Sequence, residues 1–335
     1  MVQYKFLNEE IFPDGVKVFH FTLSRVTTEE ANAIRRTVLM NIPVIGIGNT
    51  KVLINETSFP SEMIISRLQG IYLNNKGLEE KENLKFEITC PENEVLFDVE
   101  SQMIKPLEGF ITPRMHIVSL KPGQRLSISF DLIRSSSIIH NHYSCASAVG
   151  FSLVEDKFIA GTTNVSTIAA DKTYQMSIET TGVHEAVFIL KTAINILIGD
   201  FEKARVRDAD LAIRVTKIDE NRIVVIIPNN QYTLSQTIAC YLLMMDKSII
   251  RAAGSKMPDQ LQPNSEVHVT GENPLENYHK AIDKIQHNYR ELLGQISGAK
   301  ESQEQREPRE SRESKGSSTT KNSTTTKGSR GSSKK

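Results

Sequence analysis

Three side chains between residues 140 and 145 have the types and the spacing of metal ligands. They form the pattern His140-x-His142-x-x-Cys145. Imidazole and thiolate groups bind Zn²⁺, and this spacing could supply three of the four ligands of a tetrahedral site. A fourth ligand is not local in the sequence, so the alternative is a polar loop at a subunit contact. We favour the polar loop and predict no metal and no cofactor.

The cysteines indicate no other sulfur chemistry. Cys90, Cys145 and Cys240 are the only three, and no two of them form a Cys-x-x-Cys pair. This excludes a disulfide framework and a four-cysteine zinc site, and it favours a reducing compartment. The glycines do not form a phosphate-binding loop. We therefore predict that the chain has no catalytic residues and is not an enzyme by itself.

Length and composition are those of a globular protein with two or three domains. The chain has 335 residues, of which 39% are apolar and 24% charged. A domain typically takes about 100–200 residues. No run of about 18 apolar residues is present, so we expect no membrane-spanning helix and no membrane partner. The first residues do not combine a basic with an apolar stretch, so we expect no secretory signal.

The C-terminal residues differ in composition from the rest of the chain. Residues 299–335 contain ten Lys and Arg, five Glu, and no Val, Ile, Leu, Phe or Tyr. Such a segment buries too little apolar surface to offset the entropy lost on ordering. Residues 298–335 are therefore predicted to be a disordered, basic, Ser- and Thr-rich tail. The tail could attract nucleic acid through phosphate contacts, or it could only keep the chain soluble.

Apolar residues recur at helical spacing in four segments. The predicted helices span residues 28–42, 184–203, 233–246 and 274–296. Thr27 and Glu30 have the spacing of a capping box before the first helix, and Thr233 and Gln236 have it at the third. The remaining segments are predicted to be strands and turns. The fold class is therefore α+β.

One order of elements occurs twice along the chain. A strand, a capped helix and a long C-terminal helix are predicted within residues 1–205, and a similar series within 206–297. We predict a first module at 1–48 and 171–205, a β-rich insert domain at 49–170, and a second module at 206–297. Two such modules would pair their apolar helix faces. The residues expected in the shared core are Ile34, Val38, Val187, Leu190, Ile194, Leu234, Ile238, Leu242 and Ile282.

Several motifs of the first module and the insert form one recognisable series. They are Asn32-Ala33-Ile34-Arg35-Arg36, Ile42-Pro43-Val44-Ile45-Gly46-Ile47, Asn55-Glu56-Thr57-Ser58, Glu62-Met63-Ile64-Ile65-Ser66-Arg67-Leu68 and Glu179-Thr180-Thr181-Gly182. This series resembles the assembly subunits of multisubunit RNA polymerases. Those are the bacterial alpha subunit, the archaeal D subunit and the third-largest eukaryotic subunit. His142 matches a histidine-containing loop of the family's insert domain.

Motifs of the second module resemble the smaller partner of that family, the archaeal L or eleventh eukaryotic subunit. They are Tyr232-Thr233-Leu234-Ser235-Gln236 and Ala253-Gly254-Ser255-Lys256-Met257-Pro258, followed by Leu261, Pro263, Pro274 and Ala281. Ser235 and Gln236 replace the family's glycine and asparagine. Cys90 and Cys145 cannot supply the zinc loop or iron–sulfur cluster that many family members carry.

The resemblance implies a non-catalytic scaffold. Two alpha-subunit-like dimerisation modules in one chain would form an intramolecular dimer and assemble a DNA-directed RNA polymerase, a nucleotidyltransferase complex, for transcription. The implied partners are the second-largest and largest polymerase subunits and small zinc-bearing subunits, with DNA bound only through the holoenzyme. The alternative is a stand-alone nucleic-acid-binding protein that acts through its basic tail.

Some polar residues of these motifs are candidates for the subunit interface. They are Asn32, Arg35, Arg36, Glu62, Arg67 and His142. Arginine suits bidentate pairing with carboxylates, and the resemblance implies a large-subunit contact for the helix that carries Arg35 and Arg36. The alternative for these two is a solvated helix face. For Glu62 and Arg67 it is a local salt bridge that contributes little.

Fusion of the two families in one chain resembles the arrangement found in large nucleocytoplasmic DNA viruses. It implies a viral origin. The chain would then act in the virus-infected host cell, in the cytoplasm or the nucleus, and could be packaged in the virion.

Overall fold

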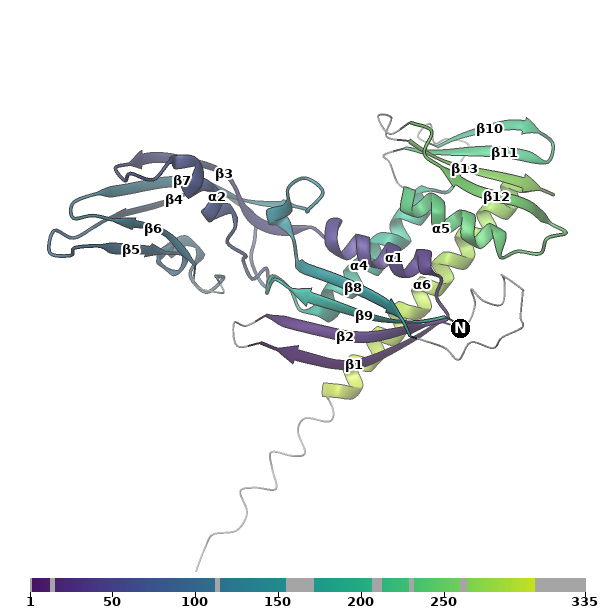
Figure 1. The fold of residues 1–335 in the computed structure, drawn as a ribbon, viewed down its shortest axis with the longest axis horizontal. Coiled ribbons are helices and arrows are strands. Elements are labelled where there is room, and N and C mark those ends of the chain that lie inside the picture. The colour runs from purple at the N-terminus through teal and green to yellow at the C-terminus, as the bar shows by residue number, and fades with distance from the viewer. Residues whose placement is uncertain are drawn as a thin grey trace, which may run out of the picture. The chain divides into compact units, whose positions relative to one another are not determined.

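The structure is a computed structural model that describes residues 2–12, 16–111, 115–154, 172–206, 213–228, 232–259 and 264–304. The chain divides into two compact units, Met1–Ile296 and Ser297–Lys335. Helices and antiparallel sheets make up the first unit, which confirms the α+β class (Figure 1). None of the helices in the described ranges combines the length and the apolarity that a bilayer crossing requires.

The first four-stranded sheet joins the beginning of the chain to its middle. Its order is β1-β2-β9-β8, and every neighbouring pair is antiparallel. The strands are β1 (Gln3–Ile11), β2 (Lys17–Ser24), β8 (Ala146–Leu153) and β9 (Thr173–Thr180), and the helices that follow β2 and β9 are α1 (Thr28–Met40) and α4 (Ala186–Lys203). Phe19, Phe21 and Leu23 alternate along β2 and are buried, so one face of this sheet contributes to the core.

The second four-stranded sheet lies entirely in the C-terminal part of the chain. Its order is β10-β11-β13-β12, again antiparallel throughout. The strands are β10 (Arg214–Asp219), β11 (Arg222–Pro228), β12 (Ile250–Lys256) and β13 (Asn264–Gly271), and the helices that follow β11 and β13 are α5 (Tyr232–Leu243) and α6 (Pro274–Glu304). In both sheets a hairpin pairs with the strand that precedes a long helix, and that strand pairs with an edge strand.

The residues between α1 and β8 form a separate set of elements. They are β3 (Val44–Asn55), α2 (Ser61–Gln69), β4 (Lys81–Thr89), β5 (Phe97–Glu100), η1 (Ser101–Met103), η2 (Lys105–Leu107), β6 (His116–Leu120), β7 (Arg125–Ser135) and η3 (Asn141–Tyr143), where η marks a 3₁₀ helix. They build a β3-β7-β4 sheet and a β5-β6 ribbon. Buried residues from Ile45 to Leu132 form their own apolar cluster.

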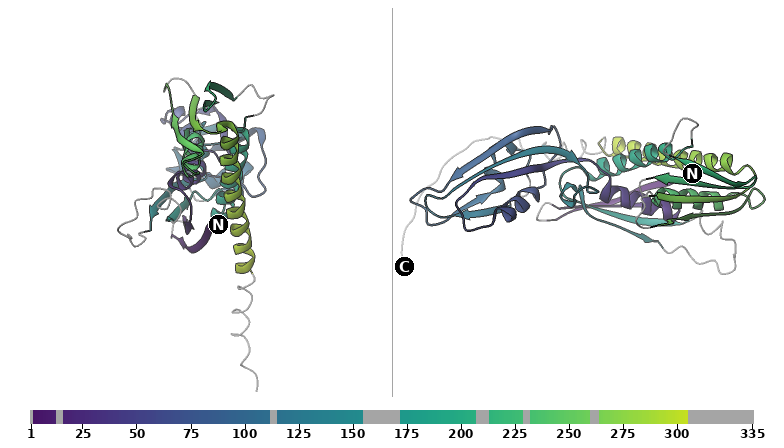
Figure 2. Two further views of the ribbon diagram at one scale, coloured as in Figure 1. Left: turned by 90° about the vertical axis from the view of Figure 1, so that its right-hand side faces the viewer. Right: turned by 90° about the horizontal axis from the view of Figure 1, so that it is seen from above.

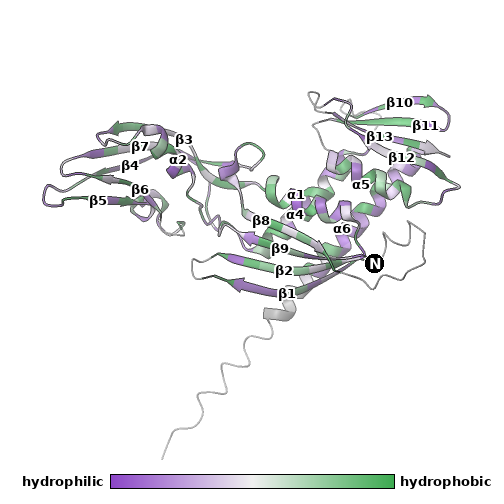
Figure 3. Cartoon of the chain, in the orientation of Figure 1, coloured by the Kyte–Doolittle hydropathy of each residue, from purple (hydrophilic) through white to green (hydrophobic). Residues whose placement is uncertain are grey.

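A larger apolar cluster is shared by the two four-stranded sheets and the four helices α1, α4, α5 and α6. Each of these helices presents an apolar stripe to it, and α6 shows hydrophobic residues interleaved with hydrophilic ones along its length (Figure 3). α4 and α6 lie side by side (Figure 2), and hydrogen bonds join them near Ile198 and Ala204. The helices therefore bury their stripes against one another and against the sheets.

The four predicted helices are present, but each differs from its predicted range at one end or both: α1 ends at Met40, α4 begins at Ala186, α5 spans Tyr232–Leu243 and α6 extends to Glu304. The capping box of α1 is confirmed: Thr27 and Glu30 exchange both hydrogen bonds. The capping box predicted at Thr233 and Gln236 is wrong, because α5 begins at Tyr232 and Thr233 lies inside the helix. α6 continues to Glu304, so the first residues of the predicted tail are helical, since Ala, Lys, Glu and Gln favour helix. Residues 305–335 lie outside the described residues.

The segment 49–170, predicted to be β-rich, also contains the helix α2, which the strand and turn pattern did not indicate. Only Ile64 and Leu68 of this helix are buried. A short helix with a single buried apolar pair carries too weak a periodicity to be separated from a strand.

Candidate intramolecular interface

The predicted core positions lie where α1, α4, α5 and α6 meet. Eight of the nine are buried in the shared cluster, namely Ile34, Val38, Leu190, Ile194, Leu234, Ile238, Leu242 and Ile282. Val187 is half-buried and packs against the same cluster. Because α1 and α4 precede residue 206 and α5 and α6 follow it, these side chains join two distant parts of the chain.

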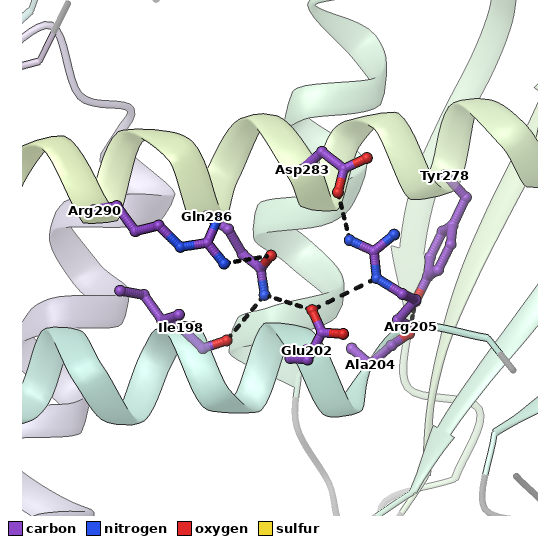
Figure 4. Close-up of polar contacts among 8 residues, drawn as sticks. All are labelled: Ile198, Glu202, Ala204, Arg205, Tyr278, Asp283, Gln286 and Arg290. Atoms are coloured by element: carbon purple, nitrogen blue, oxygen red, sulfur yellow. Dashed lines mark hydrogen bonds and ion pairs between the residues drawn. The ribbon is translucent and has the colours of Figure 1, made fainter.

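A polar group of α6 also reaches α4 within this apolar surrounding (Figure 4). Gln286 is 2% exposed. Its amide nitrogen donates to the Ile198 carbonyl at 3.1 Å and to Glu202 Oε2 at 3.0 Å, and its amide oxygen accepts from Arg290 at 3.3 Å. A buried amide must have such partners, because leaving it unpaired would cost about 1–3 kcal/mol.

The ends of α4 and α6 are joined by a second group of contacts (Figure 4). Arg205 forms an ion pair with Asp283 and lies 3.5 Å from Glu202 Oε2. Its hydrogen bond to Asp283 raises the pKa of the guanidinium. Tyr278, which is fully buried, donates its hydroxyl to the Ala204 carbonyl at 2.8 Å and so occupies an acceptor beyond the end of α4.

The C-terminal part of α6 contacts the first strand of the chain. The Gln295 amide nitrogen donates to the Val2 carbonyl at 2.7 Å, and its amide oxygen accepts from the Tyr4 backbone N–H at 2.7 Å. The side chain thus supplies β1 with the donor and the acceptor that a neighbouring strand would offer. The first and last parts of the described unit are linked through this amide.

A buried carboxylate lies where α1, α5 and α6 meet. Glu30 is 1% exposed. Its Oε2 accepts from the Thr27 backbone N–H at 2.8 Å and its Oε1 accepts from the Tyr241 hydroxyl at 2.6 Å. Asn288 donates to the Tyr241 oxygen at 2.5 Å. Burial raises the pKa of Glu30, and these hydrogen bonds oppose that increase.

The remaining face of α1 carries the predicted large-subunit contact. Arg35 donates from Nε and from one terminal nitrogen to Asn32 Oδ1, at 3.1 and 3.0 Å. Both residues are half-buried, and Arg36 is exposed. The Arg35 guanidinium is thereby oriented on the helix surface, with donors left for a partner's carboxylate. Its role in binding a partner stays a prediction.

Two further interface candidates, Glu62 and Arg67, lie on α2 and differ in their contacts with the rest of the chain. Glu62 is exposed. Arg67 donates to the Ile117 carbonyl at 2.7 Å, and its guanidinium lies 4.6 Å from the centre of the Phe59 ring. Arg67 therefore connects α2 to β6, a contact that accounts for its position without a partner subunit.

The candidate metal ligands separate into two environments. His140 and His142 face each other, with their Nδ1 atoms 2.5 Å apart. The Cys145 thiol is buried and donates to the Val38 carbonyl at 3.5 Å instead, and burial raises the pKa of Cys145 to about 12. Across the part of the chain that the structure describes, no group of three His, Cys, Asp or Glu side chains is placed to hold a metal ion.

The loop that contains His142 packs against β3. A side chain added at Gly46 would meet the Tyr143 ring at 3.0 Å, and one at Gly48 would meet the Tyr143 oxygen at 2.7 Å. The two glycines therefore make room for Tyr143. Burial, followed by the charge of His140, lowers the pKa of His142 to about 4.

The sequence did not indicate the polar residues of this interface. Gln286 lies within the apolar stripe of α6, Arg205 lies just beyond the end of α4 and Asp283 lies on the exposed face of α6, and their partners are far away in the sequence. Glu30 was identified only as a capping residue. One signal was available: Gln286 interrupts the apolar stripe of α6 between Ile285 and Tyr289.

Comparisons with known proteins give two archaeal relatives. The chain is 27% identical over 168 residues to the DNA-directed RNA polymerase subunit Rpo3 of Methanocaldococcus jannaschii, a match that covers 50% of this chain and 78% of the relative. It is 31% identical over 137 residues to Rpo3 of Thermococcus kodakarensis, which covers 38% of this chain and 51% of the relative. The chain thus spans about half the length of the second relative. No protein-family model matches the chain.

Proposed function

We propose that this chain is a non-catalytic assembly subunit of a DNA-directed RNA polymerase, built as an intramolecular version of the alpha-like dimer. The similarity to two Rpo3 subunits supports an RNA polymerase subunit. The observation that carries the dimer proposal is the common core of α1, α4, α5 and α6, which belong in pairs to two sheets of the same strand order.

The order of elements along the chain supports two dimerisation modules. One series runs β1, β2, α1, β8, β9 and α4, and the other runs β10, β11, α5, β12, β13 and α6. In each series the first helix follows a hairpin and the second follows the inner strand. The elements from β3 to β7 interrupt only the first series, between α1 and β8. This is the arrangement expected for a duplicated module with one insert domain.

Fusion makes the pairing of the modules local. Two partners joined by a short link have an effective concentration of order mM, provided that the link can span the sites. The apolar core and the Gln286, Arg205 and Tyr278 contacts would then form before any other subunit binds. The paired chain would present a preformed surface for assembly.

The proposed partners are the second-largest and largest polymerase subunits and small zinc-bearing subunits. Asn32, Arg35 and Arg36 on α1 are the proposed contact with a large subunit. The half-buried, oriented Arg35 supports this choice, because a fixed guanidinium loses little entropy when it binds a carboxylate. DNA would be bound only through the holoenzyme.

The fused arrangement also underlies a proposal about origin. We propose a viral polymerase that acts in the virus-infected host cell, in the cytoplasm or the nucleus, and that could be present in the virion. Detection of the chain by mass spectrometry in purified particles and in fractions of infected cells would test this.

A native purification of the tagged full chain tests the assembly role. We expect two very large polymerase subunits at a one-to-one ratio by quantitative mass spectrometry. Recovery of the chain alone, or only with nucleic acid, would contradict the proposal.

The second candidate function is nucleic-acid binding through the basic tail. From Ser314 onward the sequence has six Lys and Arg and no acidic residue, which favours phosphate contacts. Deleting residues 305–335 separates the two functions, and it leaves α6 intact because that helix ends at Glu304. The assembly role predicts unchanged recovery of the large subunits. The alternative predicts that the main activity is lost.

A further inference from the structure

The Glu30 carboxylate lies in an unusual place for a capping residue. A capping box requires one carboxylate oxygen, and Oε2 serves it by accepting from the Thr27 N–H. The first turn of a helix normally exposes this group to water, but Glu30 is 1% exposed. The second oxygen, Oε1, is therefore buried as well and must find a donor inside the protein.

The donor comes from the other half of the chain. Tyr241 on α5, 211 residues away in the sequence, donates to Oε1 at 2.6 Å. Asn288 on α6 donates in turn to the Tyr241 oxygen, which leaves the Tyr241 proton directed at Glu30. The Lys284 ammonium lies 5.9 Å from the centre of the Tyr241 ring. No tyrosine occurs on α1 or α4, so the first half has no such donor on its own helices.

Without the Tyr241 hydroxyl, the buried carboxylate would lose the donor to Oε1 and would keep only its interactions with Thr27 and Asn288. The carboxylate would then turn toward water or take up a proton, and both changes weaken the hydrogen bond that Oε2 accepts from the Thr27 N–H. The start of α1 thus depends on the position of α5. Asn32 and Arg35 lie within the next turn and a half of the same helix.

We propose that Glu30 is a positioning residue through which Tyr241 and Asn288 of the second half hold the first turn of α1. Docking of α5 and α6 orders the capping box and so presents Asn32 and Arg35 in a defined orientation. The consequence for subunit binding rests on the proposed function. The effect on the capping box does not.

Two tyrosines provide a matched pair of variants. Tyr241→Phe removes the hydroxyl that Glu30 accepts from and keeps the ring. Tyr289→Phe removes a hydroxyl on α6 that is equally buried and feels the charge of Glu30 but makes no hydrogen bond within the described residues, so it controls for the hydrogen bond alone. Both variants lose one oxygen from the same core, so a general packing effect would be similar in the two.

Hydrogen exchange of the full-length chain, followed by mass spectrometry or NMR, tests the proposal. In Tyr241→Phe we expect the amides that the capping box protects, those of Thr27, Glu30 and Ala31, to exchange at least about tenfold faster, while amides inside α4 change by less than about threefold. In Tyr289→Phe we expect neither set to change. The α4 amides serve as the internal measure of global stability.

Unchanged exchange at Thr27, Glu30 and Ala31 in Tyr241→Phe would overturn the proposal, as would an equal increase in α4 or in Tyr289→Phe. If Tyr241→Phe does not fold, Asn288→Ala provides a milder test, because it keeps the Tyr241 hydroxyl and removes the amide that contacts both that hydroxyl and Glu30. We then expect a smaller increase confined to the same three amides. These rates are measured on the isolated chain, so a failed purification of polymerase subunits would leave them unaffected.

Discussion

The Gln286 amide of α6 donates to the Ile198 carbonyl of α4 at 3.1 Å, across 88 residues of sequence. Because Ile198 lies in the middle of a helix, its carbonyl already belongs to the backbone ladder of α4, and the amide adds a second donor to it. The same nitrogen contacts Glu202 one turn further on. This side chain therefore sets the register of α6 along α4.

Replacement of Gln286 by glutamate is expected to destabilise the fold strongly. The new carboxylate would be buried beside the carboxylate of Glu202. Glu202 would also lose the amide donor that Gln286 now provides. We expect the free energy of unfolding at neutral pH to fall by about 2–4 kcal/mol, measured by urea denaturation. Gln286→Leu removes the same hydrogen bonds without adding charge and should lose less. Equal losses in the two variants at neutral pH would contradict this account of the site.

Truncation of the shared core should affect both halves together. Ile34 and Leu234 are buried on α1 and α5. We expect Ile34→Ala and Leu234→Ala each to lower the free energy of unfolding by about 2–5 kcal/mol, because each leaves a cavity. Ile139→Ala, at a residue that is 74% exposed, is the control and should change it by less than about 0.5 kcal/mol. Thermal melts in which both core variants match the control would argue against a common core.

His142 should make the fold less stable in acid. Burial and the charge of His140 lower its pKa from 6.5 to about 4. Between these values the unfolded chain binds more protons than the folded chain, so the free energy of unfolding falls as the pH drops from 6.5 to about 4. In His142→Gln this part of the loss should disappear. Other groups, including Glu30 with its raised pKa, remain in both proteins and cancel in the difference. Parallel stability curves for the two proteins would show that His142 does not contribute.

Charge reversal at Arg35 tests the proposed contact with a large subunit. Within the described residues, the hydrogen bonds of the Arg35 side chain go to Asn32, a neighbour on the same helix. Arg35→Glu should therefore leave the fold intact, as measured by circular dichroism. We expect recovery of the large subunits in the native purification to fall at least about tenfold, because a like charge would face the partner's carboxylate. Arg251→Glu makes the same charge change at an exposed position of β12 and should leave recovery unchanged. Normal recovery with Arg35→Glu would remove Arg35 from the proposed contact.

Local interactions explain why the helices were predictable from the sequence. Apolar residues at helical spacing and the Thr27–Glu30 capping box act within a few residues of each other, so their pattern is visible in the sequence. The same reasoning failed at Thr233, where capping-box spacing occurs inside α5. It also failed at α2, where one buried pair is too little to define a period. The predicted domain boundaries remain predictions.

The sequence by itself determined the α+β class, the four long helices and the side chains suited to their buried stripes, because these depend on neighbours along the chain. The tertiary structure alone decided which polar groups meet inside the core. Gln286 with Ile198, Gln295 with Tyr4, and Glu30 with Tyr241 are 88, 291 and 211 residues apart. A buried polar side chain must find its partner wherever the fold places a donor or acceptor, and no short-range pattern records that position.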